Sequence, residues 1–379
     1  MFDFIFTKKL SGLFINSSTM KNIFLIIIGS FFCNCIFAQD SSINKNKLTI
    51  SAYAELYYSY DFNNPQNNTK PGFIYNFNRN NEVNLNLGFI KASYNSENVR
   101  ANLSIAAGTY MNAAYSSEPG TLKNIFEANA GIKISKKNNM WIDAGIFSSH
   151  IGSESAVGAT SWNLTRSIVA ENTPYYESGV KFSYTSKNNI WLLSALFLNG
   201  WQHIARPNSN TSPAFGTQVT FTPSANFSLN YSTFIGNDKP DSIKQERYYN
   251  NLYAIFQCTK SLALQLGFDY GLQQKAKGSS SFNNLFAPLI LLRFTSGNNN
   301  IVARAEYYSD PNEIIVQSGT PNGFKIFGWS INYDRQITSK IMWRIEARNL
   351  VGKDNYFSDH NNNTSNNSTF LTTSIAVSF

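Results

Sequence analysis

Charged residues are scarce in this chain. Lys, Arg, Asp and Glu make up 14% of its 379 residues, against roughly 25% in ordinary soluble domains. So low a share argues against a soluble enzyme of this size, which would carry more Lys and Glu and clear helical stretches. Aromatic residues are abundant instead, at 15%, with 30 Phe and 20 Tyr. This composition favours short alternating strands joined by polar loops.

Cysteine and histidine are also scarce, at three residues each. Cys33 and Cys35 lie in an N-terminal apolar run, and Cys258 is the remaining cysteine, which excludes an internal disulfide and a cysteine metal site in an exported chain. Three dispersed histidines give no metal-ligand spacing: His150, His203 and His360. Ser153 follows His150 closely, but serine is frequent throughout, so the pair carries no catalytic signal. We expect no enzyme, no cofactor and no catalytic, cofactor-binding or metal-binding residue.

The one continuous apolar run covers residues 22–38, after Lys21 and before Gln39. A basic start, an apolar stretch and a small residue at the end form a secretory signal peptide. The alternative, a membrane-anchoring helix, needs roughly 20 apolar residues. We therefore predict a signal peptide at 1–38, with Met20 as an alternative start of translation. A short periplasmic segment at 39–46 and a barrel at 47–379 would follow.

From residue 48 onward the chain repeats runs of about ten residues in which apolar and polar side chains alternate. In the first run Leu48, Ile50 and Leu56 share one face, whereas Thr49, Ser51 and Glu55 share the other, as in a strand with two unlike surfaces. In the second run Lys91 interrupts the apolar alternation, which predicts a β-bulge there. Sixteen such runs occur, at 48–60, 83–94, 99–109, 126–134, 141–148, 179–185, 191–199, 215–221, 227–235, 249–259, 262–272, 285–294, 301–308, 324–333, 341–350 and 369–379.

The connections between these runs alternate in length. Short connections rich in Asn, Ser, Lys, Gly and Pro occur at 95–98, 135–139, 186–189, 222–226, 259–261, 296–300 and 336–340. Long ones include 63–81, 111–123, 149–176, 200–212, 237–247, 309–323 and 352–367. This alternation is typical of an all-β transmembrane up-and-down antiparallel barrel, with short periplasmic turns and long extracellular loops. We predict about 16 strands, within 14–18, closed because lipid leaves no partner for an open sheet edge.

The chain ends with an alternating run that finishes at Phe379. Such an ending resembles the C-terminal signal by which the barrel assembly machinery recognises outer-membrane barrels, so we expect that machinery, membrane lipid and lipopolysaccharide as partners. The net charge of +8 comes from scattered cations with no basic run, which argues against a nucleic-acid partner.

The polar face of the strands would line the barrel interior, because a charge facing lipid costs about 2–4 kcal/mol near the midplane. Both signs on this wall suggest a water-filled lumen, where the charges would either set an ion preference or stiffen the wall as salt bridges. Because the signs nearly balance, we expect weak ion selectivity. The expected pore-lining residues are Glu55, Glu127, Lys133, Asp143, Glu177, Lys181, Arg293, Arg304, Glu306, Arg344, Glu346 and Arg348, with Asp269 and Asp334 on the same face.

The longest loop, 149–176, is polar and contains His150, Glu154, Arg166 and Glu171. A long loop folded into the lumen is a common way to narrow a wide barrel, and we hypothesise that these residues form a constriction. The alternative is an external loop.

The segment 143–184 carries a family resemblance. It contains Gly145-Ile146-Phe147, Ile151-Gly152-Ser153-Glu154, Arg166-Ser167, Pro174 and Gly179-Val180. This pattern resembles the putative beta-barrel porin, OmpL-like, family of outer-membrane proteins, although Ser148 and Ser149 stand where Lys or Thr is often seen. The resemblance covers about a tenth of the chain and implies a porin in the outer membrane.

These features predict a passive diffusion channel for ions and small polar solutes, since a barrel of 16 strands is wide enough for water. The alternative is a plugged barrel that acts in binding or adhesion through its Asn-rich extracellular loops. A homotrimer is a common state of barrels of this size, although the outward faces show no clear protein-contact stripe.

Overall fold

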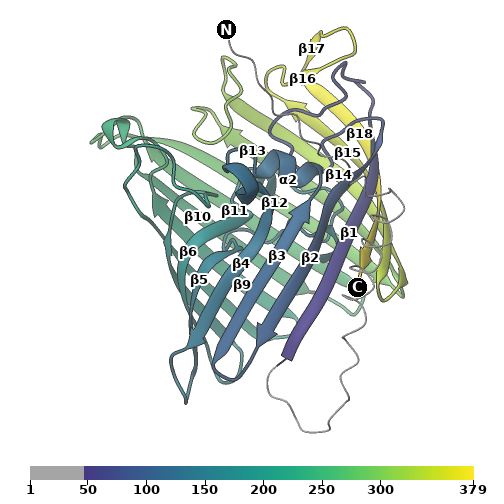
Figure 1. Ribbon diagram of the computed structural model, residues 1–379. Coiled ribbons are helices and arrows are strands. Elements are labelled where there is room, and N and C mark those ends of the chain that lie inside the picture. The colour runs from purple at the N-terminus through teal and green to yellow at the C-terminus, as the bar shows by residue number, and fades with distance from the viewer. Residues whose placement is uncertain (1–46) are drawn as a thin grey trace, which may run out of the picture. The chain divides into compact units, whose positions relative to one another are not determined.

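The computed structural model describes residues 47–379, which form a closed antiparallel barrel of sixteen strands (Figure 1). Each strand pairs with its neighbours in the chain, and the first strand closes the barrel against the last. The predicted up-and-down barrel is confirmed. The expected signal peptide at 1–38, the start at Met20 and the segment 39–46 lie outside the described residues. No helix in the described part is both long and apolar enough to cross a membrane.

The strands follow the predicted runs closely. Their bounds are β1 Lys47–Asp61, β2 Val83–Asn95, β3 Val99–Ala107, β4 Ile125–Lys133, β5 Asn139–Ser148, β6 Tyr176–Thr185, β7 Trp191–Leu198, β8 Ala214–Ser224, β9 Phe227–Gly236, β10 Arg247–Gln257, β11 Leu262–Gln274, β12 Phe282–Ser296, β13 Asn299–Asp310, β14 Phe324–Thr338, β15 Ile341–Gly352 and β18 Asn367–Ser378. A small hairpin, β16 Phe357–Ser358 and β17 Thr364–Ser365, stands apart from the barrel wall.

Alternation along each strand separates an outer apolar face from an inner polar one. On β1 the side chains of Glu55 and Tyr57 are buried inside, whereas Leu56 between them is 50% exposed on the outside. The bulge lies elsewhere than predicted. Tyr53 pairs with Phe89 and Ser51 with Lys91, and the register shifts opposite Asn86 instead. The prediction of a bulge at Lys91 is therefore wrong.

The inner polar network explains where the bulge falls. The side chain of Asn86 points inside, accepts a hydrogen bond from the Phe77 amide and donates one to Glu55. Beyond it Phe89 also faces the interior, where its ring stacks between Tyr53 and Phe126 at centroid distances of 5.4 and 5.3 Å. The apolar side chain of Phe89 thus belongs to the inner wall.

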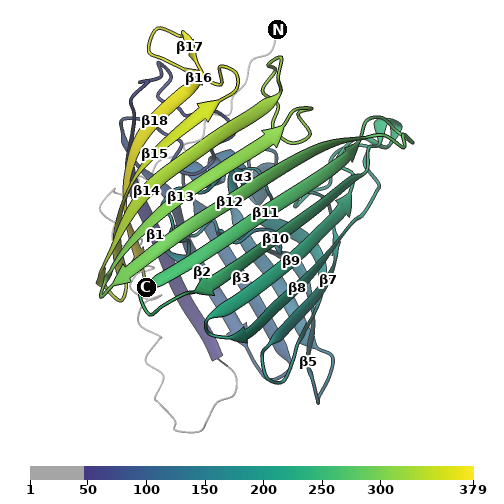
Figure 2. The same ribbon diagram turned by 180° about the vertical axis from the view of Figure 1, so that it is seen from behind.

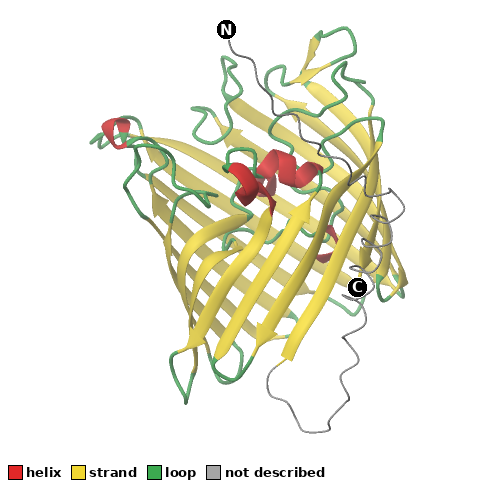
Figure 3. Ribbon diagram, in the orientation of Figure 1, coloured by secondary structure: helices red, strands yellow, loops and turns green. Residues whose placement is uncertain are grey.

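Short turns gather at one end of the barrel and long loops at the other (Figures 1 and 2). The helical segments lie among the long loops (Figure 3); they are α2 Thr109–Ala114, α3 Ile168–Glu171 and the 3₁₀ turns η1 Gly120–Asn124, η2 Gly158–Thr160 and η3 Asp241–Ile243. An eighth long connection, 275–281, joins β11 to β12. Two of the helical segments, η2 and α3, belong to the loop that follows β5.

Candidate functional site

The loop 149–175 between β5 and β6 lies inside the barrel and is hydrogen-bonded to the far wall. The Thr165 amide donates to Glu346 at 2.6 Å, and Arg304 donates to the Thr165 carbonyl at 2.8 Å. Asn163 donates to Ser330 at 3.0 Å. The loop therefore crosses the whole interior, because β13–β15 lie opposite the strands from which it starts (Figure 2).

Two more arginines of the wall hold the loop backbone. Arg344 donates to the carbonyls of Gly158 at 2.7 Å and Trp162 at 2.8 Å, and Arg348 donates to the Arg166 carbonyl at 2.7 Å. Three buried acidic residues balance these cations, through the ion pairs Arg344–Asp334, Arg304–Glu346 and Arg348–Glu306. Guanidinium groups suit this task, since each offers five N–H donors to carboxylates and carbonyls at once.

The start of the loop is fixed by His150. Its ring nitrogens lie 2.8 Å from a carboxylate oxygen of Glu177 and 2.8 Å from the Thr233 carbonyl. Both partners are acceptors, so a doubly protonated ring satisfies the two contacts. Burial lowers the pKa of His150, but the Glu177 carboxylate outweighs this effect and the pKa is raised overall. The side chain of His150 is therefore buried, with 5% of its surface exposed.

The loop meets β1 through a glycine. A Cβ atom on Gly158 would lie 2.2 Å from a carboxylate oxygen of Glu55, so a larger residue would have to displace this buried carboxylate or the loop. Next to it the Ala159 amide donates to the Tyr53 hydroxyl at 3.3 Å. The loop is therefore in close contact with the wall on two sides of the barrel.

A second loop, 62–82, is hydrogen-bonded to the loop 149–175. Glu171 accepts hydrogen bonds from the Tyr75 amide at 3.0 Å and from the backbone and side-chain nitrogens of Asn76. Burial raises the pKa of Glu171 to about 7, although these donors and Arg166 act in the opposite direction. Burial likewise lowers the pKa of Lys70 in the second loop to about 7. The two loops thus share a buried polar contact inside the barrel.

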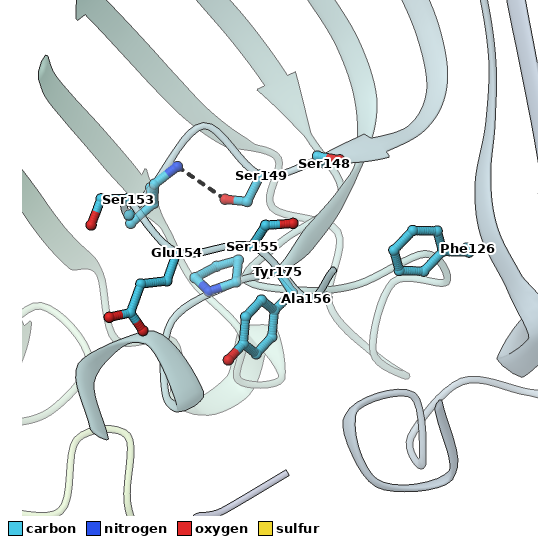
Figure 4. A pocket seen from close by; sticks show the side chains of 11 residues that line it. Phe126, Ser148, Ser149, Ser153, Glu154, Ser155, Ala156 and Tyr175 are labelled. Carbon is cyan, nitrogen blue, oxygen red and sulfur yellow. Dashed lines mark hydrogen bonds between the residues drawn. The ribbon is translucent and has the colours of Figure 1, made fainter. Parts of the chain in front are cut away.

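Two polar cavities remain on the side of β3–β6. One, of about 170 Å³, lies between Phe126 and the loop residues Ser153, Glu154 and Tyr175 (Figure 4). The other, of about 360 Å³, is lined by Arg100, Glu127, Asp143, Lys181 and neighbouring amides. Ser148 borders both cavities. The loop therefore leaves open space on this side of the interior.

The second cavity carries charges of both signs. Lys91 is ion-paired with Glu127, and Arg100 with Asp143, through its Nε at 2.6 Å. Lys181 extends its amine 4.7 Å over the Phe147 ring and forms no ion pair with a described residue. Charged side chains in such a confined space create a field across it.

The predicted wall residues all lie on inward-facing strand positions but fall into distinct groups. Glu55, Arg304, Glu306, Arg344, Glu346 and Arg348 are buried under the loop. This differs from the water-lined wall that the mixed charges suggested. Glu127, Asp143 and Lys181 border the second cavity, and Glu177 binds His150. Arg293 stacks on Trp162 of the loop at 4.1 Å, Lys133 is half-buried at the end of β4, and Asp269 and Asp334 are buried.

Of the predicted loop residues, Glu154 and Arg166 complete the inner network. Glu154 accepts from the Ser167 amide at 2.7 Å, and the fully buried Arg166 donates to the carbonyl oxygens of Ser155 and Leu164. Sequence reasoning missed Arg100 and Lys91 on the wall. Arg100 alternates with Asn102 and Ser104, a polar pattern that could have placed it inside. Lys91 was missed because the sequence analysis predicted a bulge at this residue and did not assign it to the inner face.

Comparisons with known proteins agree with this architecture. Residues 47–379 match the family model described as "Putative beta-barrel porin-2, OmpL-like". No curated protein sequence matches the chain. Among solved structures, the outer-membrane protein OmpT of Vibrio cholerae in its trimer form has a TM-score of 0.59 at 8% identity, covering 89% of this chain and all of that one.

Two further structures show the same fold. The outer-membrane channel DcaP of Acinetobacter baumannii has a TM-score of 0.59 at 10% identity, covering 90% of this chain and all of that one. The anion-selective porin from Comamonas acidovorans has a TM-score of 0.57 at 9% identity, with 88% and 100% covered. At these identities the likeness supports the fold and not a shared solute.

Proposed function

Because the chain belongs to the putative beta-barrel porin-2, OmpL-like family of the outer membrane, we propose that it is a passive diffusion channel for ions and small polar solutes. Flow down a gradient through water requires neither a cofactor nor a catalytic group. It requires a wet passage of limited width through a closed wall.

The observation that carries this proposal is the inward-folded loop 149–175, which is hydrogen-bonded to the far wall and leaves space along β3–β6. The loop is bonded to β13–β15 by Arg304, Arg344 and Arg348, whereas polar cavities of about 170 and 360 Å³ remain along β3–β6. A loop bonded to β13–β15 narrows a wide barrel and leaves a polar route along β3–β6. The solutes that fit are small, since the space beside the loop is limited.

Conductance of the purified barrel in planar lipid bilayers tests the proposal. We expect stepwise single-channel currents from the full chain. Replacing residues 153–171 by a short Gly-Ser linker should raise the unitary conductance severalfold, because the constriction is removed while the strands stay intact. Replacing the exposed tip 360–364 of the loop after β15 by a similar linker is the matched control and should leave conductance unchanged. Absence of steps from the full chain and from both variants would reject a channel.

We also propose a homotrimer, as in the trimer form of the Vibrio cholerae protein. Support comes from the outer face of β1–β5, where small residues such as Ala52, Gly88 and Ala92 stand between exposed aliphatic ones such as Ile90 and Leu103. The outer face of β7–β14 carries more aromatic residues, such as Phe197, Phe268 and Trp329. β3 and β4 are also short, at nine residues each, against fifteen in β12 and β14. Cross-linking in detergent measures the state directly.

A plugged barrel that binds a partner through its loops is the second candidate, and one contact favours it. Tyr115 stacks on Tyr176 at 3.9 Å over the extracellular mouth, and Glu118 accepts from the Tyr176 hydroxyl and the Ile204 amide at 3.0 and 2.8 Å. These contacts join two long loops to the start of β6. The same bilayer experiment separates the candidates, since a plugged barrel conducts only after residues 153–171 are removed.

A further inference from the structure

The periplasmic rim of the barrel differs sharply in charge from the opposite rim. The seven short turns hold five lysines against one acidic residue, Glu97; the lysines are Lys136, Lys137, Lys187, Lys260 and Lys340. The eight long loops carry ten basic and ten acidic residues, so their charge cancels. The basic excess of the loop and turn regions is therefore confined to the turns.

These five lysines are available to a partner. All are exposed, and none forms an ion pair within residues 47–379. They occur in the turns after β4, β6, β10 and β14, so they are spread around the circumference instead of forming one patch. A ligand that surrounds the barrel fits this arrangement better than one that touches a single side.

Aromatic side chains mark the height of the rim in the membrane. Trp191, Phe221, Phe227 and Phe256 form a continuous row across β7–β10, with successive centroid distances of 4.4, 6.5 and 5.1 Å. Such aromatic girdles sit at the level of the lipid headgroups. The turns that contain Lys187 and Lys260 lie just beyond the two ends of this row, so their amines reach the phosphate layer.

From these observations we propose that the periplasmic rim is a binding ring for anionic phospholipid headgroups of the inner leaflet. Each lysine would hold a phosphodiester as a point charge. A basic ring facing anionic lipid fixes the height of the barrel and enriches such lipid around it. This role does not depend on whether the lumen conducts.

Fluorescence quenching tests the proposal on the full barrel in phosphatidylcholine vesicles. Phosphatidylglycerol with brominated acyl chains is added in steps, with brominated phosphatidylcholine as reference, and quenching of the outward-facing Trp191 and Trp329 is followed. We expect a preference for phosphatidylglycerol of roughly fivefold per lysine-held lipid at low salt, reduced in 0.5 M NaCl. Far-UV circular dichroism confirms the barrel in each variant.

The key variant carries Lys136→Gln, Lys137→Gln, Lys187→Gln, Lys260→Gln and Lys340→Gln, and it should quench equally with both lipids. The matched control removes four exposed lysines from the long loops, Lys123→Gln, Lys275→Gln, Lys277→Gln and Lys353→Gln, and should keep the preference. Equal quenching by both lipids in the unchanged protein overturns the proposal, as does a preference that survives the turn substitutions. The proposal is also overturned if the turn variant keeps the lipid preference but, unlike the unchanged protein, no longer sediments with purified peptidoglycan. The rim would then bind the cell wall.

Discussion

Arg304 on β13 and Glu346 on β15 meet across the intervening strand β14, with the guanidinium 2.8 Å from the carboxylate. Both side chains are almost completely buried, and both bind Thr165 of the inward loop, one at its carbonyl and the other at its amide. A buried ion pair of the wall therefore also anchors the loop. Removing either partner should affect the wall and the constriction together.

The first prediction follows from this pair. Glu346→Leu leaves the Arg304 charge buried without its main partner, which should destabilise the barrel by about 3–5 kcal/mol and detach Thr165, so that unitary conductance rises. The double variant Arg304→Met with Glu346→Leu should recover most of the stability but not the anchored loop. Thermal unfolding in detergent and bilayer conductance measure the two effects; the half-exposed Glu246→Gln is the control. Unchanged conductance in both variants would mean that Thr165 does not anchor the loop.

A second prediction concerns Gly158. A Cβ atom at this position would lie within 2.2 Å of the Glu55 carboxylate, so Gly158→Ala should push the loop away from β1. We expect noisier and larger single-channel currents and a lower midpoint of thermal unfolding. Gly72→Ala is a matched control, since a Cβ there meets nothing within 4 Å. Equal behaviour of the two alanine variants contradicts the close contact.

The strands were predictable because lipid and water impose opposite chemistry on adjacent residues. Leu56 had to face outward and Glu55 inward whatever the rest of the chain did, and turn residues such as those at 186–189 marked the strand ends. The bulge opposite Asn86 was not predictable, because it depends on bonds from Asn86 to Phe77 and Glu55 across the fold.

The candidate site was predictable only in part. The length and polarity of 149–176 suggested a loop inside the lumen, and the structure places it there. The sequence did not indicate which wall would hold it, since the contact of Thr165 with Arg304 joins residues far apart in the chain. Nor could it show that His150 would be buried between Glu177 and Thr233.

A third prediction is a pH dependence of the loop contact through Glu171. Burial raises its pKa from 4.5 to about 7, so the docked loop retains a proton that the freed loop loses. Docking is therefore firmest below about pH 4.5 and weakens as the pH rises to about 7, by up to about 3 kcal/mol. Conductance fluctuations of the native barrel should increase between pH 5 and 7.5. Glu171→Gln should flatten this change, and Glu313→Gln, in the extracellular loop 311–323, should not.

Other charged groups near Glu171 also affect how the conductance fluctuations depend on pH. Arg166 and Arg348 lower the pKa of Glu171, so they shift the pH at which the response occurs. Lys70 contributes to the response only above about pH 7, at the upper edge of the window. His150 has a raised pKa and acts in the same direction, because its contacts with Glu177 and Thr233 are lost as it deprotonates. The difference between native protein and Glu171→Gln isolates the carboxylate; no difference would contradict the prediction.

The last prediction concerns ion preference along the free side of the loop. Lys91 and Arg100 are neutralised by Glu127 and Asp143, whereas Lys181 lies over Phe147 at the edge of the same cavity without an ion pair among the described residues. Its charge therefore dominates the local field. Lys181→Glu changes that field by two charges, so the ion selectivity, which we expect to be weak in the native protein, should shift clearly toward cations. Reversal potentials in a KCl gradient measure the shift. Lys353→Glu, on an exposed extracellular loop, should leave the potential nearly unchanged, and an equal shift in both variants would place the ion route away from β3–β6.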